Sequence, residues 1–196
     1  MSAERLRHLL ERIDQLNRED PTTELIGGIP QPRELLYAQR LSEWVTRLNP
    51  NPSEALQIAA RAQHIQRWTI PRDRYARNRQ GYLRWRETLK AFHIDTTARL
   101  MREAGYPEDM IARVSALMSK RHLKEDPDTQ TLEDALCLVF LETQLAELRA
   151  KTPDEKMREV LRKTWQKMSD RGRQEVLGLP LDAAQRAWLL QVIKFS

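Results

Sequence analysis

The sequence has few of the features that mark extracellular, membrane-spanning or disulfide-stabilised proteins. Cys137 is the one cysteine in 196 residues, which excludes an internal disulfide framework and indicates a reducing compartment. The longest apolar run, residues 135–141, is much shorter than the roughly 20 residues of a membrane-spanning helix. Residues 1–7 are charged and lack the apolar stretch of a signal peptide. We therefore expect a cytoplasmic protein that does not engage a membrane.

Residues that favour strands and turns are also scarce. The chain has only six glycines and few β-branched residues, whereas alanine, leucine, arginine, glutamate and glutamine are plentiful and favour helix. It shows no alternating apolar and polar pattern and no Asn-Gly or Asp-Gly hairpin signal. We predict an all-α, single-domain helical bundle that spans residues 1–196. Its core is expected at about 34–169, with the N- and C-terminal helices packed against it.

Helix breakers divide the chain into predicted helices. An amphipathic stripe stops before Asp20, and a loop with two adjacent glycines is expected at 21–32. Ser53 is a suitable N-cap. A helix that contains residues 135–141 should be central, because that run is apolar on every side. The further helices are predicted at 35–48, 53–68, 82–104, 107–121, 129–150, 153–168 and 181–193.

Positive charge is concentrated in one block. Residues 61–90 hold nine lysines or arginines against Asp73 and Glu87, although the whole chain carries only +5. This imbalance indicates a local anion site, because guanidinium groups bind phosphate or carboxylate and nearby aromatic rings can stack on a base. Gly81 is expected to let an anion approach the first amides of the helix that follows. The alternative is a solvated connector whose arginines pair with surface acids. The predicted anion- or substrate-binding residues are Arg67, Trp68, Arg72, Arg79, Arg84 and Arg86.

Histidines and carboxylates form a second candidate site. Side chains of these types, brought together from different helices of a bundle, can bind zinc, iron or manganese. The sequence has no His-Glu-x-x-His signature. Carboxylates beside a buried segment are costly unless they meet cations, donors or a metal, and the alternative for them is helix capping. The candidates are His64, His93, His122, Asp95, Glu133 and Asp134.

Several segments resemble a known family. They are residues 34–40, 59–68, 70–72, 81–86, 132–135, 139–142 and 163–169. In these segments the chain resembles a helical family of unknown function from bacteria and fungi, whose fungal members often carry a glutamyl-tRNA-synthetase-like label. That label has no support here, because the sequence has no Rossmann fingerprint and no nicotinamide or flavin signature.

The chain is also distantly similar to the HD-domain metalloproteins, which are helical phosphohydrolases with some oxygenase relatives. In this resemblance His64 and His93 stand for the first two histidines, His122 for a later one and Asp134 for the closing aspartate. The pattern departs at Ile94, where the family has an aspartate. The nearest acid follows one position later, about 100° further around the helix. The resemblance implies a divalent metal held by His64, His93 and Asp134.

Two functions follow as hypotheses. The first is a metal-dependent, HD-like hydrolase of a phosphorylated or anionic small molecule. The metal would activate a water molecule, Glu133 would transfer the proton, and the arginines would bind the anion. The second is a non-catalytic module that binds a nucleotide, RNA or protein through its arginine-rich face, with an affinity that falls steeply with salt. The sequence indicates neither the substrate nor the oligomeric state.

Overall fold

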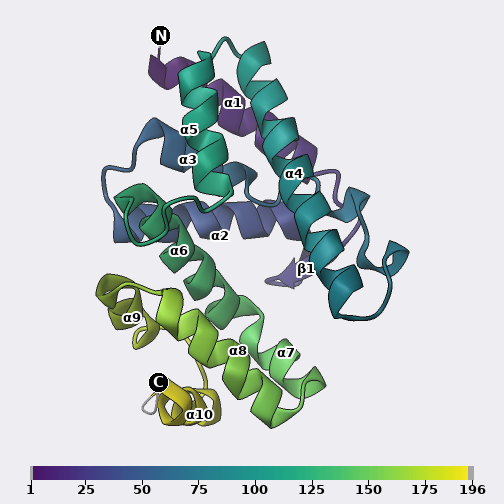
Figure 1. Ribbon diagram of the computed structural model, residues 1–196, viewed down its shortest axis with the longest axis vertical. Coiled ribbons are helices and arrows are strands. Elements are labelled where there is room, and N and C mark those ends of the chain that lie inside the picture. Colours follow the sequence, from purple (N-terminus) through teal and green to yellow (C-terminus); the bar gives the residue numbers. More distant parts are fainter. Residues whose placement is uncertain (1, 194–196) are drawn as a thin grey trace. The chain divides into compact units, whose positions relative to one another are not determined.

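The computed structural model describes residues 2–193 and is almost entirely helical (Figure 1), which confirms the all-α prediction. The chain divides into two compact units. Unit 1 comprises the residues up to Glu43 together with Asn51–Arg121, and unit 2 comprises Trp44–Pro50 together with the residues from His122 onward. The predicted domain span of 1–196 extends beyond the described residues at both ends, and a single-domain organisation stays a prediction.

Unit 1 is built around a short alanine-rich helix. This helix, α3, packs against α1 and α5, and α5 also packs against α4. Ala55, Ala59, Ala60 and Ala62 are buried in α3, and their small side chains allow neighbouring helices to approach closely. The elements of unit 1 are α1 (Ser2–Asn17), β1 (Thr23–Ile26), β2 (Ile29–Pro32), most of α2 (Arg33–Leu48), α3 (Glu54–Ala62), the 3-10 turns η1 (Arg67–Thr69) and η2 (Arg72–Arg74), α4 (Arg79–Glu103) and α5 (Glu108–Met118).

Unit 2 is built around α6, which packs against α7, α8 and α9, while α10 packs against α8. As predicted, the apolar run 135–141 lies in a central helix, since Ala135, Leu138, Val139 and Leu141 are all buried. The elements of unit 2 are the last turn of α2, α6 (Pro127–Thr143), α7 (Leu145–Lys151), α8 (Asp154–Lys167), α9 (Asp170–Val176) and α10 (Ala183–Ile193).

The predicted loop at 21–32 is wrong, because this segment forms an antiparallel β-hairpin. Ile26 pairs with Ile29 across a two-residue turn. Gly27 and Gly28 both have positive φ, 57° and 84°, as the tightest hairpin turns require. Two adjacent glycines meet that requirement as well as Asn-Gly does. The Gly27-Gly28 pair is therefore the hairpin signal in this sequence.

Some helix boundaries also differ from the prediction. The helix predicted to reach residue 68 ends at Ala62, because Gln66 adopts a left-handed conformation with φ of 50°. The helix predicted at 129–150 is interrupted at Gln144. A short helix that was not predicted, α9, follows Ser169, whose hydroxyl accepts a hydrogen bond from the Gly172 N–H (3.1 Å).

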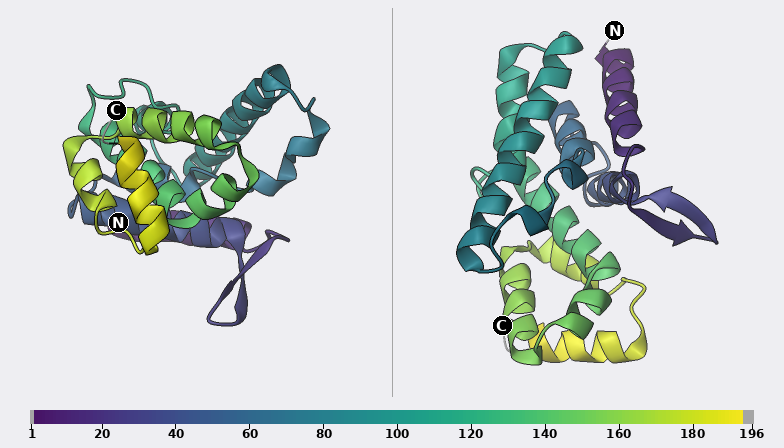
Figure 2. Two further views of the ribbon diagram at one scale, coloured as in Figure 1. Left: turned by 90° about the horizontal axis from the view of Figure 1, so that it is seen from below. Right: turned by 90° about the vertical axis from the view of Figure 1, so that its right-hand side faces the viewer.

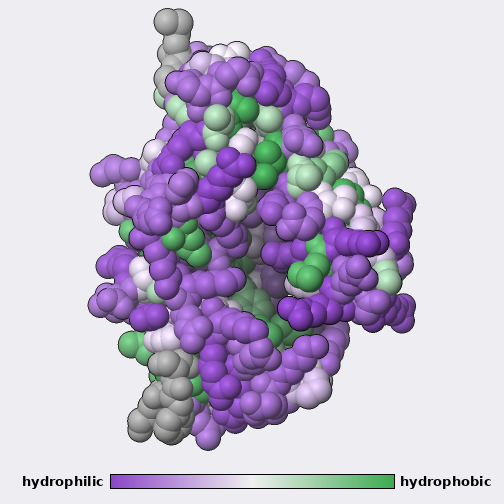
Figure 3. All heavy atoms as spheres, viewed as in Figure 1, coloured by the Kyte–Doolittle hydropathy of each residue, from purple (hydrophilic) through white to green (hydrophobic). Residues whose placement is uncertain are grey.

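Within the described part of the chain, no helix is long and apolar enough to cross a membrane. On the face shown in Figure 3, hydrophilic residues dominate and hydrophobic residues appear in small, separate groups. The most exposed large apolar side chains belong to the hairpin, with Leu25 at 72% and Ile29 at 62% exposure.

Candidate functional site

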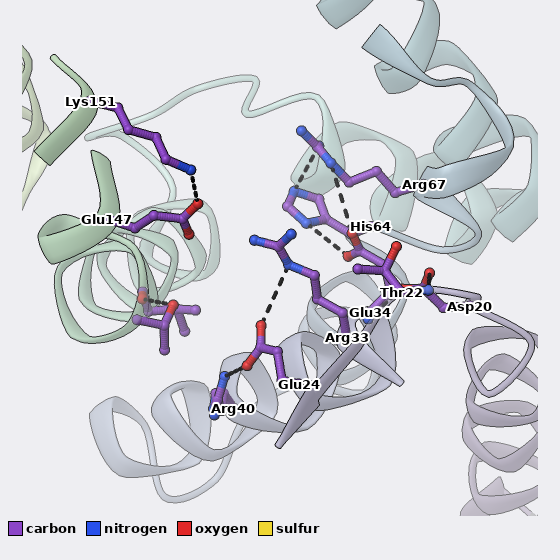
Figure 4. A network of polar contacts seen from close by, with 12 residues as sticks. Asp20, Thr22, Glu24, Arg33, Glu34, Arg40, His64, Arg67, Glu147 and Lys151 are labelled. Carbon is purple, nitrogen blue, oxygen red and sulfur yellow. Dashed lines mark hydrogen bonds and ion pairs between the residues drawn. The ribbon is translucent and has the colours of Figure 1, made fainter. Parts of the chain in front are cut away.

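Five side chains of unit 1 form a largely buried polar cluster, here called the Glu34 cluster. Glu34 and Tyr37 come from the start of α2, His64 and Arg67 from the segment after α3, and His93 from the middle of α4. Figure 4 shows Glu34, His64 and Arg67 directed toward one another. His64 Nδ1 lies 3.4 Å from Glu34 Oε2, and Arg67 Nη1 lies 3.5 Å from His64 Nε2. Arg67 Nε lies 3.9 Å from Glu34 Oε1.

Two buried side chains near the end of α1 position the cluster. Asp20 accepts hydrogen bonds from the Thr22 and Glu34 N–H groups (2.9 and 3.0 Å), which caps the start of α2 and fixes Glu34 in its first turn (Figure 4). Asn17 Oδ1 accepts a hydrogen bond from the Gln66 N–H (3.0 Å) and thereby fixes the segment that carries His64 and Arg67.

The His64 imidazole is held in its neutral form. Burial, followed by the charges of Arg67, Arg86 and Lys120, keeps the pKa of His64 well below its usual value of 6.5. A neutral ring donates through one nitrogen and accepts through the other. With Glu34 at Nδ1 and Arg67 at Nε2, the arrangement fits a proton on Nδ1. Tyr37 stacks on the ring with a centroid distance of 4.1 Å and an interplanar angle of 13°, which fixes its orientation.

His93 is a second neutral histidine beside His64. Its ring is 5.9 Å from the His64 ring, and burial is the main cause of a pKa lowered to about 3. His93 Nδ1 lies 2.9 Å from the Ile65 carbonyl oxygen and therefore carries the proton. His93 Nε2 is buried and has no hydrogen-bond partner within residues 2–193, whereas buried Glu34 Oε2 has His64 Nδ1 as its neighbour. The cluster thus presents one open acceptor atom, His93 Nε2, that can bind an N–H or O–H group of a ligand.

The pKa values of Glu34 and Arg67 are shifted in opposite directions, and burial is the main cause of both shifts. Burial raises the pKa of Glu34, and the charges of Arg67 and Arg33 oppose that rise. Burial lowers the pKa of Arg67, and Glu34 opposes that fall. Glu34, with its raised pKa, and neutral His64 thus place two titratable groups with shifted pKa values side by side, a pattern that is frequent at sites of general acid–base chemistry.

The predicted anion-binding arginines have different environments. The Arg67 guanidinium lies over the Trp85 ring, 4.9 Å from its centroid, and belongs to the cluster. Arg72 donates to the carbonyl oxygens of Tyr75 and Ala76 (2.9 and 2.8 Å), so it stabilises its own turn. Trp68 is half-buried in η1.

Arg79, Arg84 and Arg86 are exposed on α4. No acidic group of residues 2–193 forms an ion pair with any of these three side chains. Arg86 is also close enough to lower the pKa of both His64 and Arg67. Of the predicted anion-binding residues, Arg67 and Arg86 are therefore the two that are linked to the Glu34 cluster.

The interpretation of Gly81 as an opening for an anion is wrong. A Cβ at this position would lie 2.1 Å from the Ala76 carbonyl oxygen. The Gly81 N–H donates to Asn78 Oδ1 (2.8 Å), which caps α4. Glycine is required here because the preceding turn packs directly against the helix.

Two of the three predicted metal ligands lie in unit 1 and the third lies in unit 2. His64 and His93 are neighbours, whereas Asp134 belongs to unit 2. There it accepts hydrogen bonds from the Ser169 N–H (2.8 Å), the Ser169 hydroxyl and Gln130 Nε2 (3.0 Å). Within residues 2–193, no three histidine, cysteine, aspartate or glutamate side chains form a group that could hold a metal ion. We therefore assign no chemical step to a metal.

The other residues proposed from the sequence as catalytic or metal-binding differ in burial and in their contacts. Glu133 is buried in unit 2, with Oε1 3.4 Å from Lys167 Nζ. His122 is exposed, and its Nδ1 lies 3.2 Å from Glu125 Oε2. Asp95 lines an open groove of about 500 Å³ between α4 and α5.

Comparison with known protein families gives a match over most of the chain. Residues 7–189 match the family described as "Domain of unknown function (DUF4202)". The chain belongs to this family. The match confirms the expected membership of an uncharacterised family, and it includes the whole Glu34 cluster. No curated protein and no solved structure matches the chain.

Sequence reasoning found the two histidines and Arg67 but missed Glu34 and Tyr37. An acid in the first turn of a helix is normally explained by the helix dipole, so Glu34 drew no attention. The available signal was the spacing of Glu34 and Tyr37, three residues apart on one helix face, within the segment 34–40 that carries the family resemblance.

Proposed function

We propose that unit 1 binds a phosphorylated small molecule and hydrolyses its phosphate ester, with Arg67 and Arg86 binding the phosphate and His64 acting as the base. The supporting observation is the neutral His64 ring, which lies between the Glu34 carboxylate and the Arg67 guanidinium. No side chain is assigned a role through a metal.

The charge balance around His64 favours an anionic ligand. Arg67, Arg86 and Lys120 all disfavour a proton on this histidine, whereas Glu34 is the carboxylate beside it. A phosphate next to Arg67 and Arg86 would offset this excess of positive charge. Guanidinium groups suit the role because they donate two parallel hydrogen bonds to phosphate oxygens.

The arrangement also supports proton transfer. When the phosphate binds, Arg67 donates to it instead of to His64 Nε2, which leaves that nitrogen free. His64 Nε2 then accepts a proton from a water molecule as the water oxygen bonds to phosphorus, and the ester oxygen leaves and takes up a proton from solvent. Glu34 accepts a hydrogen bond from Nδ1 and stabilises the imidazolium that forms. The contacts of 3.4 and 3.5 Å at the two ring nitrogens are long, as catalytic hydrogen bonds often are before substrate binds.

A second candidate function is a non-catalytic module that binds a nucleotide or RNA. It is favoured by the exposed Arg79, Arg84 and Arg86, which have no acidic partner in the described part of the chain. Tyr82 is also 45% exposed beside them and offers a ring on which a base can stack.

The decisive experiment measures hydrolysis of a panel of phosphorylated metabolites by the full chain, and binding of pyrophosphate by calorimetry. His64→Gln is expected to lower kcat by about 10²- to 10⁴-fold with little change in pyrophosphate affinity. Arg86→Gln is expected to weaken pyrophosphate binding. Arg99→Gln is the matched control, because Arg99 lies on the same helix but pairs with Glu103 (2.8 Å). Parallel assays with EDTA test the divalent metal expected from the sequence.

The two functions predict different results. Turnover that depends on His64 supports the hydrolase. No turnover with any compound, together with RNA binding that weakens steeply with salt and is lost in an Arg79→Gln, Arg84→Gln double variant, contradicts the hydrolase and supports the binding module.

A further inference from the structure

The hairpin has one open and one closed edge. The Arg33 N–H donates to the Thr22 carbonyl oxygen (2.9 Å), which continues the ladder beyond β2. Residue pairs in an antiparallel ladder alternate between hydrogen-bonded and non-hydrogen-bonded. Because Thr22 and Arg33 form a hydrogen-bonded pair, this contact determines which of the following pairs are hydrogen-bonded and which have backbone groups that point outward. In the observed register, the backbone groups of Thr23 and Leu25 point outward from β1, and Pro30 and Pro32 occupy the outward positions of β2.

The outer edge of β2 cannot accept another strand in the normal way. Proline has no N–H group, and both outward positions of this strand are prolines. Proteins use edge prolines to prevent further strand pairing. The outer edge of β1 differs, because Thr23 and Leu25 keep both their donors and their acceptors.

The open edge borders an exposed apolar surface. Residues paired across the two strands share a face, so Leu25 and Pro30 lie together on one face of the hairpin. Leu25 is 72% exposed, and Ile26 and Ile29 on the other face are 44% and 62% exposed. Figure 2 shows the hairpin standing away from the helices of unit 1. An isolated two-stranded hairpin is marginally stable in water, and additional strands stabilise it.

We propose that β1 pairs antiparallel with β1 of a second copy of this chain, forming a four-stranded sheet about a two-fold axis. Leu25 lies opposite its own counterpart, and the two residues exchange backbone hydrogen bonds. Glu24 lies opposite Ile26 of the second copy, so no like charges meet. The two prolines on each outer edge stop the sheet at four strands, which gives dimers and prevents fibres.

The short edge favours a second copy over an unrelated peptide. β1 has four residues and only two outward-facing positions, Thr23 and Leu25, so backbone bonds alone contribute little. A second copy adds its own Leu25 and Pro30 to the same face and buries both apolar pairs at once. Glu24 is already paired with Arg33 (3.5 Å) and Arg40 (3.1 Å), so its charge is compensated beside the interface.

The test is the mass of the full chain by sedimentation over a range of concentrations. We expect the mass to rise from 23.1 kDa to twice that value and no further. Leu25→Arg places two like charges opposite each other and is expected to leave a monomer with an unchanged circular dichroism spectrum. Leu25→Thr keeps the strand and its edge and is expected to raise the dimer Kd at least about tenfold. Leu177→Arg, at a site 58% exposed in unit 2, is the control and should still dimerise.

Register is tested independently by a cross-link. Leu25→Cys should form a disulfide-linked dimer on mild oxidation, because opposed residues of paired strands lie within disulfide range. Native Cys137 is buried, so the unmodified chain should not cross-link. A monomer at every concentration overturns the proposal, as do assemblies larger than a dimer or dimerisation that survives Leu25→Arg.

Discussion

The side chain of Asn17, the last residue of α1, accepts a hydrogen bond from the backbone N–H of Gln66, 49 residues later in the chain. This bond fixes the left-handed residue that precedes Arg67, so the position of the cluster depends on a helix that contributes no side chain to it. The segment that carries His64 and Arg67 is therefore held by the Asn17 amide, as Glu34 is held by Asp20.

Replacing Asn17 should disturb both stability and the site. Asn17→Leu, of similar size, leaves the part-buried Gln66 N–H without its acceptor and is expected to cost about 1–3 kcal/mol of unfolding free energy. Urea unfolding measures this loss, and weaker pyrophosphate binding should accompany it. Gln15→Leu, at an exposed position of the same helix, should change neither quantity. Wild-type stability for Asn17→Leu would show that the bond is dispensable.

His93 predicts a pH dependence of stability. Its pKa is about 3 in the folded protein and near 6.5 when unfolded, so the unfolded chain binds the proton first as pH falls. Unfolding free energy should therefore decrease from pH 6.5 toward pH 3, by up to about 1.4 kcal/mol per pH unit from this group. His93→Gln should flatten the measured curve over that window. The exposed His8→Gln variant should not, and parallel curves for His93→Gln and wild type would contradict the assignment.

Gly81 should be intolerant of any side chain. Gly81→Ala puts a Cβ 2.1 Å from the Ala76 carbonyl oxygen, and backbone must move to relieve the clash. We expect a loss of about 3 kcal/mol or more in thermal or urea unfolding, at the upper end of the range for overpacking. Gly178→Ala is the matched control, since its nearest neighbour would be 3.6 Å away. Equal stability of the two variants would contradict the close approach of the turn to α4.

Asp134 should matter for unit 2 and not for the proposed chemistry. Asp134→Ala removes the acceptor for the Ser169 N–H and hydroxyl and for Gln130, so α9 loses its anchor. We expect about 2–4 kcal/mol of destabilisation, because three part-buried donors lose their partner. Any hydrolysis per folded molecule should be unchanged. Glu155→Ala, which removes an exposed ion pair, should cost less than about 1 kcal/mol. Loss of turnover at full stability would instead assign Asp134 to the site.

Much of the helical architecture could be predicted because local residues determine it. Ser53 caps α3 through the Leu56 N–H, and Gly105, with φ of 76°, follows the end of α4. The premature end of α3 and the existence of α9 could not be predicted in this way. Both depend on hydrogen bonds from residues distant in sequence, Asn17 for the first and Asp134 for the second.

The site was predictable by residue type and not by arrangement. The sequence singled out His64, His93 and Arg67 because side chains of these types bind ligands or transfer protons. In the structure all three belong to the Glu34 cluster. Asp134 stood out for the same reason, but its hydrogen bonds go to Ser169 and Gln130 in unit 2. The carboxylate that lies beside His64 is Glu34. Its position follows from the path of the chain through the hairpin into α2, which local sequence patterns do not determine.

Helix α2 contributes to both units, because unit 1 ends at Glu43 and the last turn, from Trp44, belongs to unit 2. Within unit 2 the Trp44 indole donates to Glu142 Oε2 (2.8 Å). A protease that cuts the turns at 119–126 therefore does not release unit 2 complete, since part of it remains on the N-terminal fragment. Neither unit can be obtained intact by dividing the gene at one point, and expression of separate halves would have to duplicate or graft the Trp44 segment.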